Sequence, residues 1–384
     1  LLVGSAIAIF LVSIYYPPAT ENFLSITSDE DFIKLGFPGN GSRENPYMIE
    51  NIEFGIYNEY TKLKNATLVS IQSTTKHFVI RNCTFARGAL GLYVGDVEAG
   101  TARIENNIFI SKLFCMIDSE ENYEKCYRGD ALHIQANGVT ITNNTFSAEI
   151  TDVPKGYFKA IIVQNSKDCI ISENTIEYCI ESINIYSSEN ITVCNNYFDA
   201  TASGVYSIDS DSILVDNNIF LGNYYYTMYF KETVNVMITN NNISLSGTIN
   251  TAAIGIVNCS LIQLSYNFVS NATIGIRVYR SQLVNIVSNE LWKCNEYAIY
   301  LFEETSNTTV YYNVFMHNGE DYSDQTQCCD DGTDNYWYNS TLSEGNYWND
   351  IGNYTVYEIN GSAGSIDLYP LSSPIDLGLF LNQI

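Results

Sequence analysis

Acidic side chains are the first candidates for chemistry in this sequence of 384 residues. Four aspartates crowd residues 316–343, a stretch that interrupts an otherwise regular pattern: Asp324, Asp330, Asp331 and Asp334. Carboxylate oxygens in acidic loops are the ligands that Ca²⁺ prefers. Their spacing is not that of an EF-hand, and an ordinary solvated loop also accounts for them. Apart from Ca²⁺ at this cluster, the sequence predicts no cofactor.

Few other groups suggest acid–base or sugar-binding chemistry. Asp209 and Asp211 lie two residues apart and would share a face of a strand, although a solvated face explains such a pair as well. The tyrosine cluster 224–226, with Tyr229 and Phe230, favours either stacking on sugars or the filling of strand surfaces. The histidines have no common position in the pattern: His77, His133 and His317.

The charge balance excludes one class of partner. The chain has 18 Lys and Arg against 43 Asp and Glu, a net charge of −25, so it offers no basic surface for the phosphates of nucleic acid. The same charge opposes binding to an anionic membrane surface. Because 46% of the residues are hydrophobic and only 16% are charged, the composition predicts a folded chain.

Asparagine-linked glycosylation is predicted from twelve Asn-X-Ser/Thr motifs, although a chain rich in Asn, Ser and Thr also produces such motifs by chance. Covalent N-glycans on these residues are typical of an extracellular or cell-surface protein. The twelve asparagines are Asn40, Asn65, Asn82, Asn143, Asn190, Asn242, Asn258, Asn271, Asn307, Asn339, Asn353 and Asn360.

Ten cysteines indicate the same location. None of them forms a CxxC pair or a Cys/His set with zinc spacing, so we expect most of them to form disulfides. Cys115 and Cys126 bracket an acidic loop and are predicted to close it as a local disulfide. The other pairings cannot be deduced from the sequence.

The first sixteen residues carry no charge, and Pro17-Pro18 end the run. A helix of this length spans about 24 Å, short of a bilayer core of about 30 Å. We predict that this segment contacts a neighbouring copy of the chain and builds a homopolymer, because buried apolar residues need an apolar partner. A retained signal or anchor, or packing against its own chain, are the alternatives. The predicted contact residues are Leu1, Leu2, Val3, Ile7, Ile9, Phe10, Leu11, Val12, Ile14 and Tyr15.

A repeat organises the rest of the chain. An apolar residue, two mostly polar residues, Asn, any residue and a bulky apolar residue recur nine times. The repeated asparagines are Asn107, Asn144, Asn174, Asn196, Asn218, Asn241, Asn267, Asn289 and Asn313. Most spacings are 22–26 residues, which fits one three-strand coil of a parallel β-solenoid. We expect the asparagines to stack at one edge, at turns with a left-handed backbone.

The predicted fold is all-β: a right-handed parallel β-helix of roughly thirteen coils, about 60 Å long at about 4.8 Å per coil. It follows an apolar N-terminal segment, residues 1–20, and a cap, residues 21–45, in which Ser28 and the acidic residues after it predict a helix over 28–35. The β-helix covers residues 46–372, with the insertion at 316–343, and residues 373–384 form a tail.

Motifs at both ends of the repeat sharpen this prediction. The first is GFPGNGS at residues 36–42, followed by NPYMIEN at 45–51, and the second is GNYWND at 345–350, followed by DLYPL at 367–371. With the repeats, they resemble the NosD-like and carbohydrate-binding/sugar-hydrolase β-helix domains of archaeal surface proteins, over residues 26–372. That family contains enzymes, binders and structural rods, so the resemblance is specific for the fold and weak for the function.

The predicted function is that of a non-catalytic, extracellular structural glycoprotein that assembles into a filament or surface layer. Pectinase-like β-helix hydrolases carry Asn-Thr-Asp, Asp-Asp and Gly-His-Gly motifs, which do not occur here as a set, so no catalytic residue is predicted and the chain is predicted not to be an enzyme. A polysaccharide lyase or hydrolase and a carbohydrate-binding module are the alternatives.

Glycosylation is directly testable. If several of the twelve motifs are occupied, the intact mass of the native protein will exceed the 43.1 kDa of the bare chain. A measured mass equal to that of the bare chain would contradict the prediction.

Overall fold

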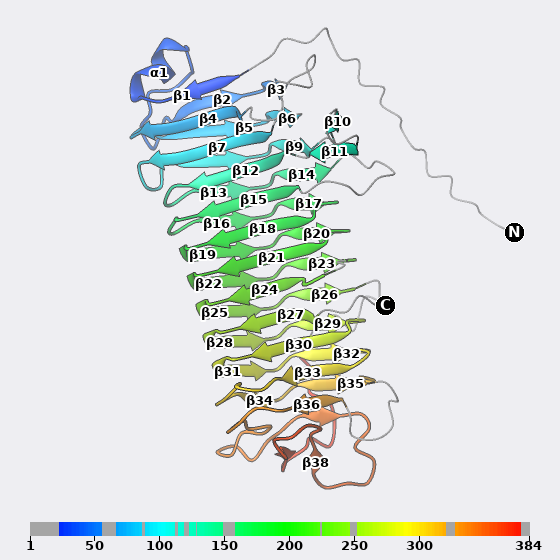
Figure 1. Ribbon diagram of the computed structural model, residues 1–384. Helices are drawn as coiled ribbons and strands as arrows, with labels where there is room; N and C mark the ends of the chain where they lie inside the picture. The colour runs from blue at the N-terminus through cyan, green and yellow to red at the C-terminus, as the bar shows by residue number, and fades with distance from the viewer. Residues whose placement is uncertain are drawn as a thin grey trace, which may run out of the picture.

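The computed structural model describes residues 23–55, 67–86, 89–111, 114–118, 123–127, 129–148, 158–222, 225–245, 252–319 and 327–377. In these residues the chain winds through stacked coils, each of which places one strand in each of three parallel sheets (Figure 1). The predicted parallel β-helix is therefore confirmed. The three sheets hold 12, 11 and 12 strands, so the estimate of roughly thirteen coils is too high.

We number the sheets in the order in which each coil passes through them. Sheet 1 contains β1 (Leu24–Ile26), β4 (Thr67–Thr74), β7 (Leu90–Val97), β12 (Asp130–Gln135), β15 (Lys159–Gln164), β18 (Glu181–Tyr186), β21 (Ser203–Ile208), β24 (Met228–Lys231), β27 (Ala252–Val257), β30 (Ile274–Tyr279), β33 (Tyr297–Leu301) and β36 (Cys328–Asp330).

Sheet 2 contains β2 (Tyr47–Glu50), β5 (Phe78–Arg81), β8 (Ala102–Glu105), β13 (Thr140–Thr142), β16 (Ile170–Ser172), β19 (Glu189–Cys194), β22 (Asp211–Asp216), β25 (Val234–Thr239), β28 (Ser260–Ser265), β31 (Gln282–Val287) and β34 (Thr309–Tyr311).

Sheet 3 contains β3 (Glu53–Gly55), β6 (Thr84–Ala86), β9 (Ile108–Ser111), β14 (Thr145–Ala148), β17 (Thr175–Glu177), β20 (Tyr197–Asp199), β23 (Ile219–Leu221), β26 (Asn242–Ser244), β29 (Phe268–Ser270), β32 (Glu290–Trp292), β35 (Val314–Met316) and β37 (Tyr347–Trp348). Two antiparallel pairs lie outside these sheets: β10 (Phe114–Asp118) with β11 (Tyr123–Tyr127), and β38 (Tyr357–Glu358) with β39 (Ile366–Asp367).

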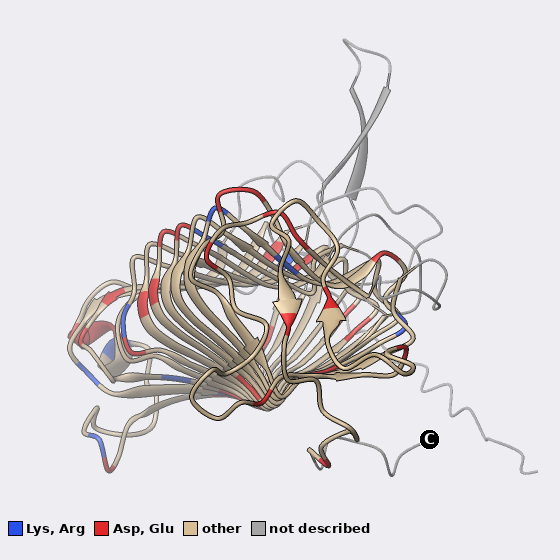
Figure 2. Ribbon diagram, turned by 90° about the horizontal axis from the view of Figure 1, so that it is seen from below, with Lys and Arg blue, Asp and Glu red and all other residues tan. Residues whose placement is uncertain are grey.

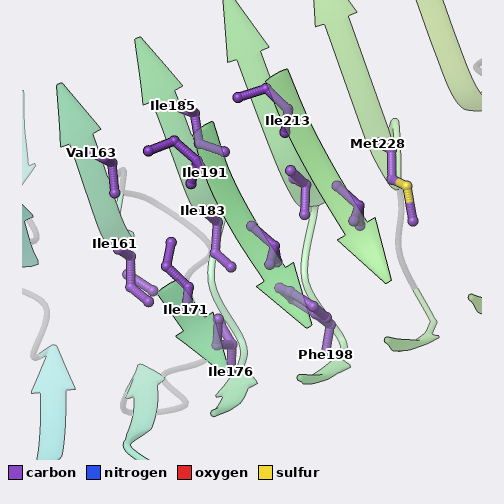
Figure 3. Packing of buried hydrophobic residues seen from close by; sticks show 14 of the residues in the cluster. Ile161, Val163, Ile171, Ile176, Ile183, Ile185, Ile191, Phe198, Ile213 and Met228 are labelled. Carbon is purple, nitrogen blue, oxygen red and sulfur yellow. The ribbon is translucent and has the colours of Figure 1, made fainter. Parts of the chain in front are cut away.

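The core follows the alternation of side chains along each strand. In β30, Ile276 and Val278 are fully buried, while Arg277 points outward. The inward residues of successive coils pack into one continuous column, in which Ile161, Ile183 and Ile185 lie side by side (Figure 3). In a view along the axis the coils superpose, with charged residues spread around their outside (Figure 2).

A ladder of buried asparagine amides runs along the edge between sheets 2 and 3. In each coil, the backbone N–H and the side-chain Nδ2 donate to the Oδ1 of the asparagine one coil later, as from Asn196 to Asn218 at 2.9 and 3.0 Å. The bonds continue without a break from Asn107 to Asn346. The predicted stacking is confirmed. Cys83 holds the ladder position one coil before Asn107, where its N–H donates to the Asn107 Oδ1.

The left-handed backbone belongs to a different residue than predicted. In most coils the residue before the ladder asparagine has positive φ, as at Asn106 (57°), Asn143 (56°) and Asn217 (53°), whereas the ladder asparagines do not. The preceding residue turns the chain, and the ladder residue is left free to point its amide inward.

The ladder ends on a buried carboxylate. Asp367 Oδ2 accepts hydrogen bonds from the Asn346 N–H at 2.8 Å and from Trp348 Nε1 at 2.9 Å. A Cβ atom on Gly345 would collide with this carboxylate, so only glycine fits there. The C-terminal sequence motif is therefore the closing structure of the ladder.

A short cap covers the first coil. Helix α1 (Asp29–Lys34) confirms the helix predicted over 28–35, although the side chain of Ser28 makes no capping hydrogen bond. Asp29 instead ties the helix to the coil: its Oδ1 accepts from Thr74 Oγ1 and the Thr75 N–H, each at 2.7 Å. Strand β1 covers the edge of β4 by parallel pairing.

The disulfide prediction is wrong for eight of the ten cysteines. None of the described Cys83, Cys169, Cys179, Cys194, Cys259, Cys294, Cys328 and Cys329 is in a disulfide. Most of them fill small buried positions of the coils, a role that the cysteine count could not reveal. The backbone register of β10 and β11 places Cys115 opposite Cys126, but their side chains lie outside the described residues, so that disulfide stays a prediction.

Residues 1–22 lie outside the described residues, and so do the assembly residues predicted between Leu1 and Tyr15. Within the described part of the chain, no helix has the length and apolar character needed to cross a membrane.

Removing one rung tests the ladder. Asn241 Nδ2 donates to Val215 O, Thr239 O and Asn267 Oδ1. Asn241→Ala removes these three hydrogen bonds and leaves the buried Asn218 N–H without its acceptor, and is expected to lower the free energy of unfolding in urea by about 3 kcal/mol. The control Gln282→Ala, at an exposed amide side chain, should change it by less than about 0.5 kcal/mol. Equal effects of the two variants would show that a ladder amide contributes no more to stability than an exposed one.

Candidate functional site

The outer face of sheet 1 gathers polar and aromatic side chains from successive coils. Its strands pair in register, so outward residues of successive coils form columns that run along the axis. The central column holds Tyr93, His133, Ile162, Asn184, Tyr206, Tyr229, Gly255, Arg277, Tyr300 and Cys329.

A charged group occupies the coils of β12, β15 and β18. Lys159 Nζ lies 2.7 Å from Glu181 Oε2 and donates to the Tyr186 hydroxyl at 3.3 Å. The Tyr186 hydroxyl in turn donates to Asn184 Oδ1 at 3.1 Å. Asp130 lies one coil earlier and accepts from the Lys159 N–H at 3.3 Å. An ammonium group, two carboxyl groups and a phenol are thus linked across three coils.

Histidine 133 extends this group toward the N-terminal end. Its ring contacts Tyr93 edge-on, with centroids 5.7 Å apart. The Tyr93 hydroxyl donates to Gln135 Oε1 at 2.8 Å, and Gln135 Nε2 donates to Gln164 Oε1 at 3.3 Å. His133 Nε2 is buried without a hydrogen-bond partner in the described structure, as is Asn184 Nδ2. Two polar atoms on this face therefore lack the partners that buried polar groups normally have.

Aromatic rings continue the face toward the C-terminal end. Tyr206 and Tyr229 stack at a centroid distance of 5.2 Å, and Tyr226 packs against Tyr229 at 4.8 Å. Gly255, the next residue of the central column, leaves room for Tyr226, because a Cβ there would lie 2.7 Å from the Tyr226 ring. These rings are half-buried and offer both an apolar surface and a hydroxyl group.

An arginine follows the rings. The Arg277 guanidinium lies 4.4 Å from the centroid of Phe302, and its Nη1 is 3.5 Å from the Tyr226 hydroxyl. Tyr300 stacks on Phe302 at 3.9 Å and donates to Asp331 Oδ2 at 2.8 Å. The face therefore carries polar and aromatic groups along most of the coil stack.

Burial shifts the pKa of several of these groups. It raises the pKa of Asp130 and lowers the pKa of His133, which favours the neutral form of each. Burial alone would lower the pKa of Lys159, but the hydrogen bond and charge of Glu181 outweigh it and the pKa is raised. Burial also raises the pKa of Tyr206 and Tyr229. The face holds proton donors and acceptors as well as stacking surfaces.

Two of the four aspartates predicted to bind Ca²⁺ hold the C-terminal segment. Asp330 is fully buried and accepts from the Gly332 N–H, Asn335 Nδ2, Trp337 Nε1 and Ser365 Oγ, at 2.7–2.9 Å. Asp331 binds Tyr300 and the Ser362 N–H. These two carboxylates fix the last coils to the C-terminal segment.

Asp334 is exposed, and Asp324 lies outside the described residues. No cluster of three or more His, Cys, Asp and Glu side chains in the described residues is arranged to hold a metal.

The other candidate residues do not converge. Asp209 lies in a turn with positive φ and Asp211 begins β22, so the two do not share a strand face. His77 and His317 lie apart from sheet 1, whereas His133 belongs to its outer face.

Most of the predicted glycosylation residues are accessible. Asn40, Asn82, Asn143, Asn190, Asn258, Asn271, Asn307, Asn353 and Asn360 are exposed, Asn242 and Asn339 are half-buried, and Asn65 lies outside the described residues. Six of the exposed ones occupy turns with positive φ. None of the eleven described asparagines belongs to a strand of sheet 1.

The sequence matches two protein families. Residues 67–243 match the family described as "Right handed beta helix region", and residues 225–353 match "Periplasmic copper-binding protein (NosD)". Neither match covers half of the chain, and over the matched residues the chain is similar to right-handed β-helix proteins and to NosD. The predicted handedness and family resemblance are confirmed, while the archaeal origin stays a prediction. No curated protein matches the chain in sequence.

Solved structures of the β-helix fold resemble this protein at low sequence identity. PfbA, a surface adhesin of Streptococcus pneumoniae, is 13% identical, with a TM-score of 0.52 over 82% of this chain and 90% of that one. A double mutant of the periplasmic alginate epimerase AlgG is 12% identical, with a TM-score of 0.51 over 86% and 73%. A mannuronic acid-specific family 6 polysaccharide lyase from human gut microbiota is 14% identical, with a TM-score of 0.52 over 83% and 88%.

The prediction that the chain is not an enzyme is wrong. It took the absence of the pectinase motifs as evidence against catalysis, whereas an epimerase and a lyase are built on this fold. At these identities the likeness shows the fold alone, so it assigns no reaction to this chain.

Sequence reasoning also missed the residues that gather on sheet 1. Part of the signal was available in the repeat frame, since Lys159 and Glu181 each lie 15 residues before a ladder asparagine and so fall in one outward column. Asp130 lies 14 residues before Asn144, so the same alignment would have placed it one position out of that column.

The shifted pKa of Asp130 gives a prediction with a defined sign. Because the folded protein holds this proton more tightly than the unfolded chain, the contribution of Asp130 to stability is greatest below the unfolded pKa of about 3.9 and is lost as pH rises through the folded pKa. Asp130→Asn should therefore raise Tm by about 1–2 °C at pH 7 and leave it nearly unchanged at about pH 3.

Asp211→Asn is the matched control. The hydrogen bond from Asn235 lowers the pKa of Asp211, so this substitution should lower Tm at neutral pH. Thermal unfolding followed by circular dichroism measures both variants. A lower Tm for Asp130→Asn at pH 7 would contradict the assigned direction.

Proposed function

We propose that this chain is an extracellular or envelope protein that binds a polysaccharide along the outer face of sheet 1. The observation that carries the proposal is the alignment of rings and hydrogen-bonding groups, from Tyr93 to Tyr300, in columns parallel to the axis. Successive rows are separated by the strand spacing of about 4.8 Å. A linear sugar chain laid along the axis would meet one row after another.

The chemistry of the face suits sugars. Tyrosine offers an apolar ring face together with a hydroxyl group, which matches the mixed apolar and polar surface of a pyranose. Arg277 has no described carboxylate within ion-pair distance, and its guanidinium is held over Phe302.

The comparisons support a carbohydrate or surface role without defining it. The adhesin is a surface protein and the epimerase is periplasmic, which agrees with the location proposed here. The accessible glycosylation motifs at the turns agree with an extracellular chain, and none of the described ones belongs to a strand of the proposed binding face. Assembly into a filament through residues 1–16 stays a separate prediction, because those residues lie outside the described structure.

Binding can be measured with defined polymers. Polymannuronate, polyguluronate and dextran serve as probes, and titration of the intrinsic tyrosine and tryptophan fluorescence reports Kd. The double variant Tyr206→Ala/Tyr229→Ala should weaken binding of the preferred polymer at least tenfold, because two stacking surfaces are lost. Tyr354→Ala removes a 69% exposed ring that belongs to no strand of sheet 1 and should leave Kd unchanged.

The outcome separates the alternatives. No binding of any of the three polymers, or equal weakening by Tyr206→Ala/Tyr229→Ala and Tyr354→Ala, would refute the proposed binding face. Chromatography of the recovered polymer shows whether it was shortened or epimerised, which would make the same face a catalytic site.

A further inference from the structure

A second surface, on sheet 2, carries exposed leucines whose backbone conformation is strained. Each coil turns from sheet 1 into sheet 2 through a residue with positive φ, and five of these are Asp168, Asn190, Ser212, Asn235 and Asn307. In the two coils between Asn235 and Asn307, the same position is occupied by Leu261 (φ 59°) and Leu283 (φ 56°).

Neither leucine is explained by the fold. A bulky side chain at positive φ is strained, whereas Asn and Asp tolerate this conformation. Burial within the chain does not compensate for this strain, since Leu261 is 52% and Leu283 is 48% exposed. A position that other coils fill with well-suited polar residues therefore carries two apolar side chains in solvent.

The leucines belong to a larger uncharged patch on the outer face of sheet 2. Met237 is 45% exposed on β25, and Tyr336 is 52% exposed beyond β34. Leu261, Leu283 and Tyr336 line a groove of about 510 Å³ together with Ile262, Gln263, Asn285, Asn307 and Thr309. We define the uncharged patch as this groove plus Met237.

The absence of charge on the patch indicates which partner binds there. The strands β25, β28, β31 and β34 contain no charged residue, although the chain has a net charge of −25. Two copies of so acidic a chain repel one another, so close contact between copies needs a surface without charge. The patch exposes Leu and Met, has a tyrosine ring at its edge and carries no charge at its centre. This composition is also typical of protein–protein contacts.

We propose that the uncharged patch is a contact between two copies of this chain, which pack sheet 2 against sheet 2 about a two-fold axis. A flat sheet face is self-complementary, and stacked sheets interdigitate their side chains. Three of the four strands have six residues and β34 has three, so with strands about 4.8 Å apart and a rise of about 3.3 Å per residue they present on the order of 300 Å² per copy. That area is smaller than a stable, specific interface buries, and it predicts weak, reversible association.

The proposal is independent of polysaccharide binding, which uses a different sheet. The test uses the full chain, produced in a host that attaches no N-glycans, because sugar on Asn307 would cover the groove. Sedimentation velocity over about 1–500 μM measures self-association of the wild type and of Leu261→Asn/Leu283→Asn. The double variant should associate at least tenfold more weakly.

A thermal measurement makes this result unambiguous. Asn suits positive φ, so the double variant should unfold at the same or a higher Tm than the wild type in dilute solution, which shows that its weaker association is not caused by unfolding. Ser212→Asn, at the equivalent turn outside the patch, is the matched control and should leave association unchanged. A wild type that stays monomeric at all concentrations, or a double variant that associates like the wild type, would overturn the proposal.

Discussion

The hydrogen-bonded line of asparagine amides is the constraint on which the rest of the molecule depends. Every rung fixes where one coil ends relative to the next, because the backbone N–H and the Nδ2 of one asparagine share a single Oδ1 acceptor on its successor. With the register set at one edge, the inward residues of all three sheets must superpose, and so must the outward ones. The phenylalanine stack of sheet 3, with Phe85 and Phe109 at 4.5 Å, follows from that register.

The ladder was predictable from the sequence because its residue type is repeated. The burial of Asn218 or Asn241 forces the same amide at the same position in every coil, and the apolar residues around it obey the same rule. The outward columns are not restricted to one residue type. Lys159 and Tyr186 are 27 residues apart and unlike one another, and only the register of β15 against β18 brings them into contact. The left-handed turn was misplaced by one residue because Asn143 and Asn144 both suit a turn, and only the backbone geometry separates their roles.

Fold and chemistry are carried by different residues of the same coil. Ile183 and Ile185 point inward and hold the solenoid together, while Asn184 and Tyr186 between and beside them face outward. Substitution of the outward residues leaves the core untouched, which explains how one architecture serves an adhesin, an epimerase and a lyase. It also explains why the absence of one family's catalytic motifs said little about whether this chain has an activity of its own.

The direction of the amide bonds has a consequence for how such a chain changes length in evolution. Along the ladder each asparagine donates to the Oδ1 of the coil that follows it and to backbone carbonyls that every coil supplies, and Asp367 is the acceptor for the last asparagine, Asn346. A duplicated or deleted unit of 22 residues, the distance from Asn174 to Asn196 and from Asn196 to Asn218, leaves every remaining amide bonded and the terminal carboxylate in place. Gene segments encoding whole coils can therefore be gained or lost one at a time, so that the length of the rod is free to drift while its two ends stay fixed.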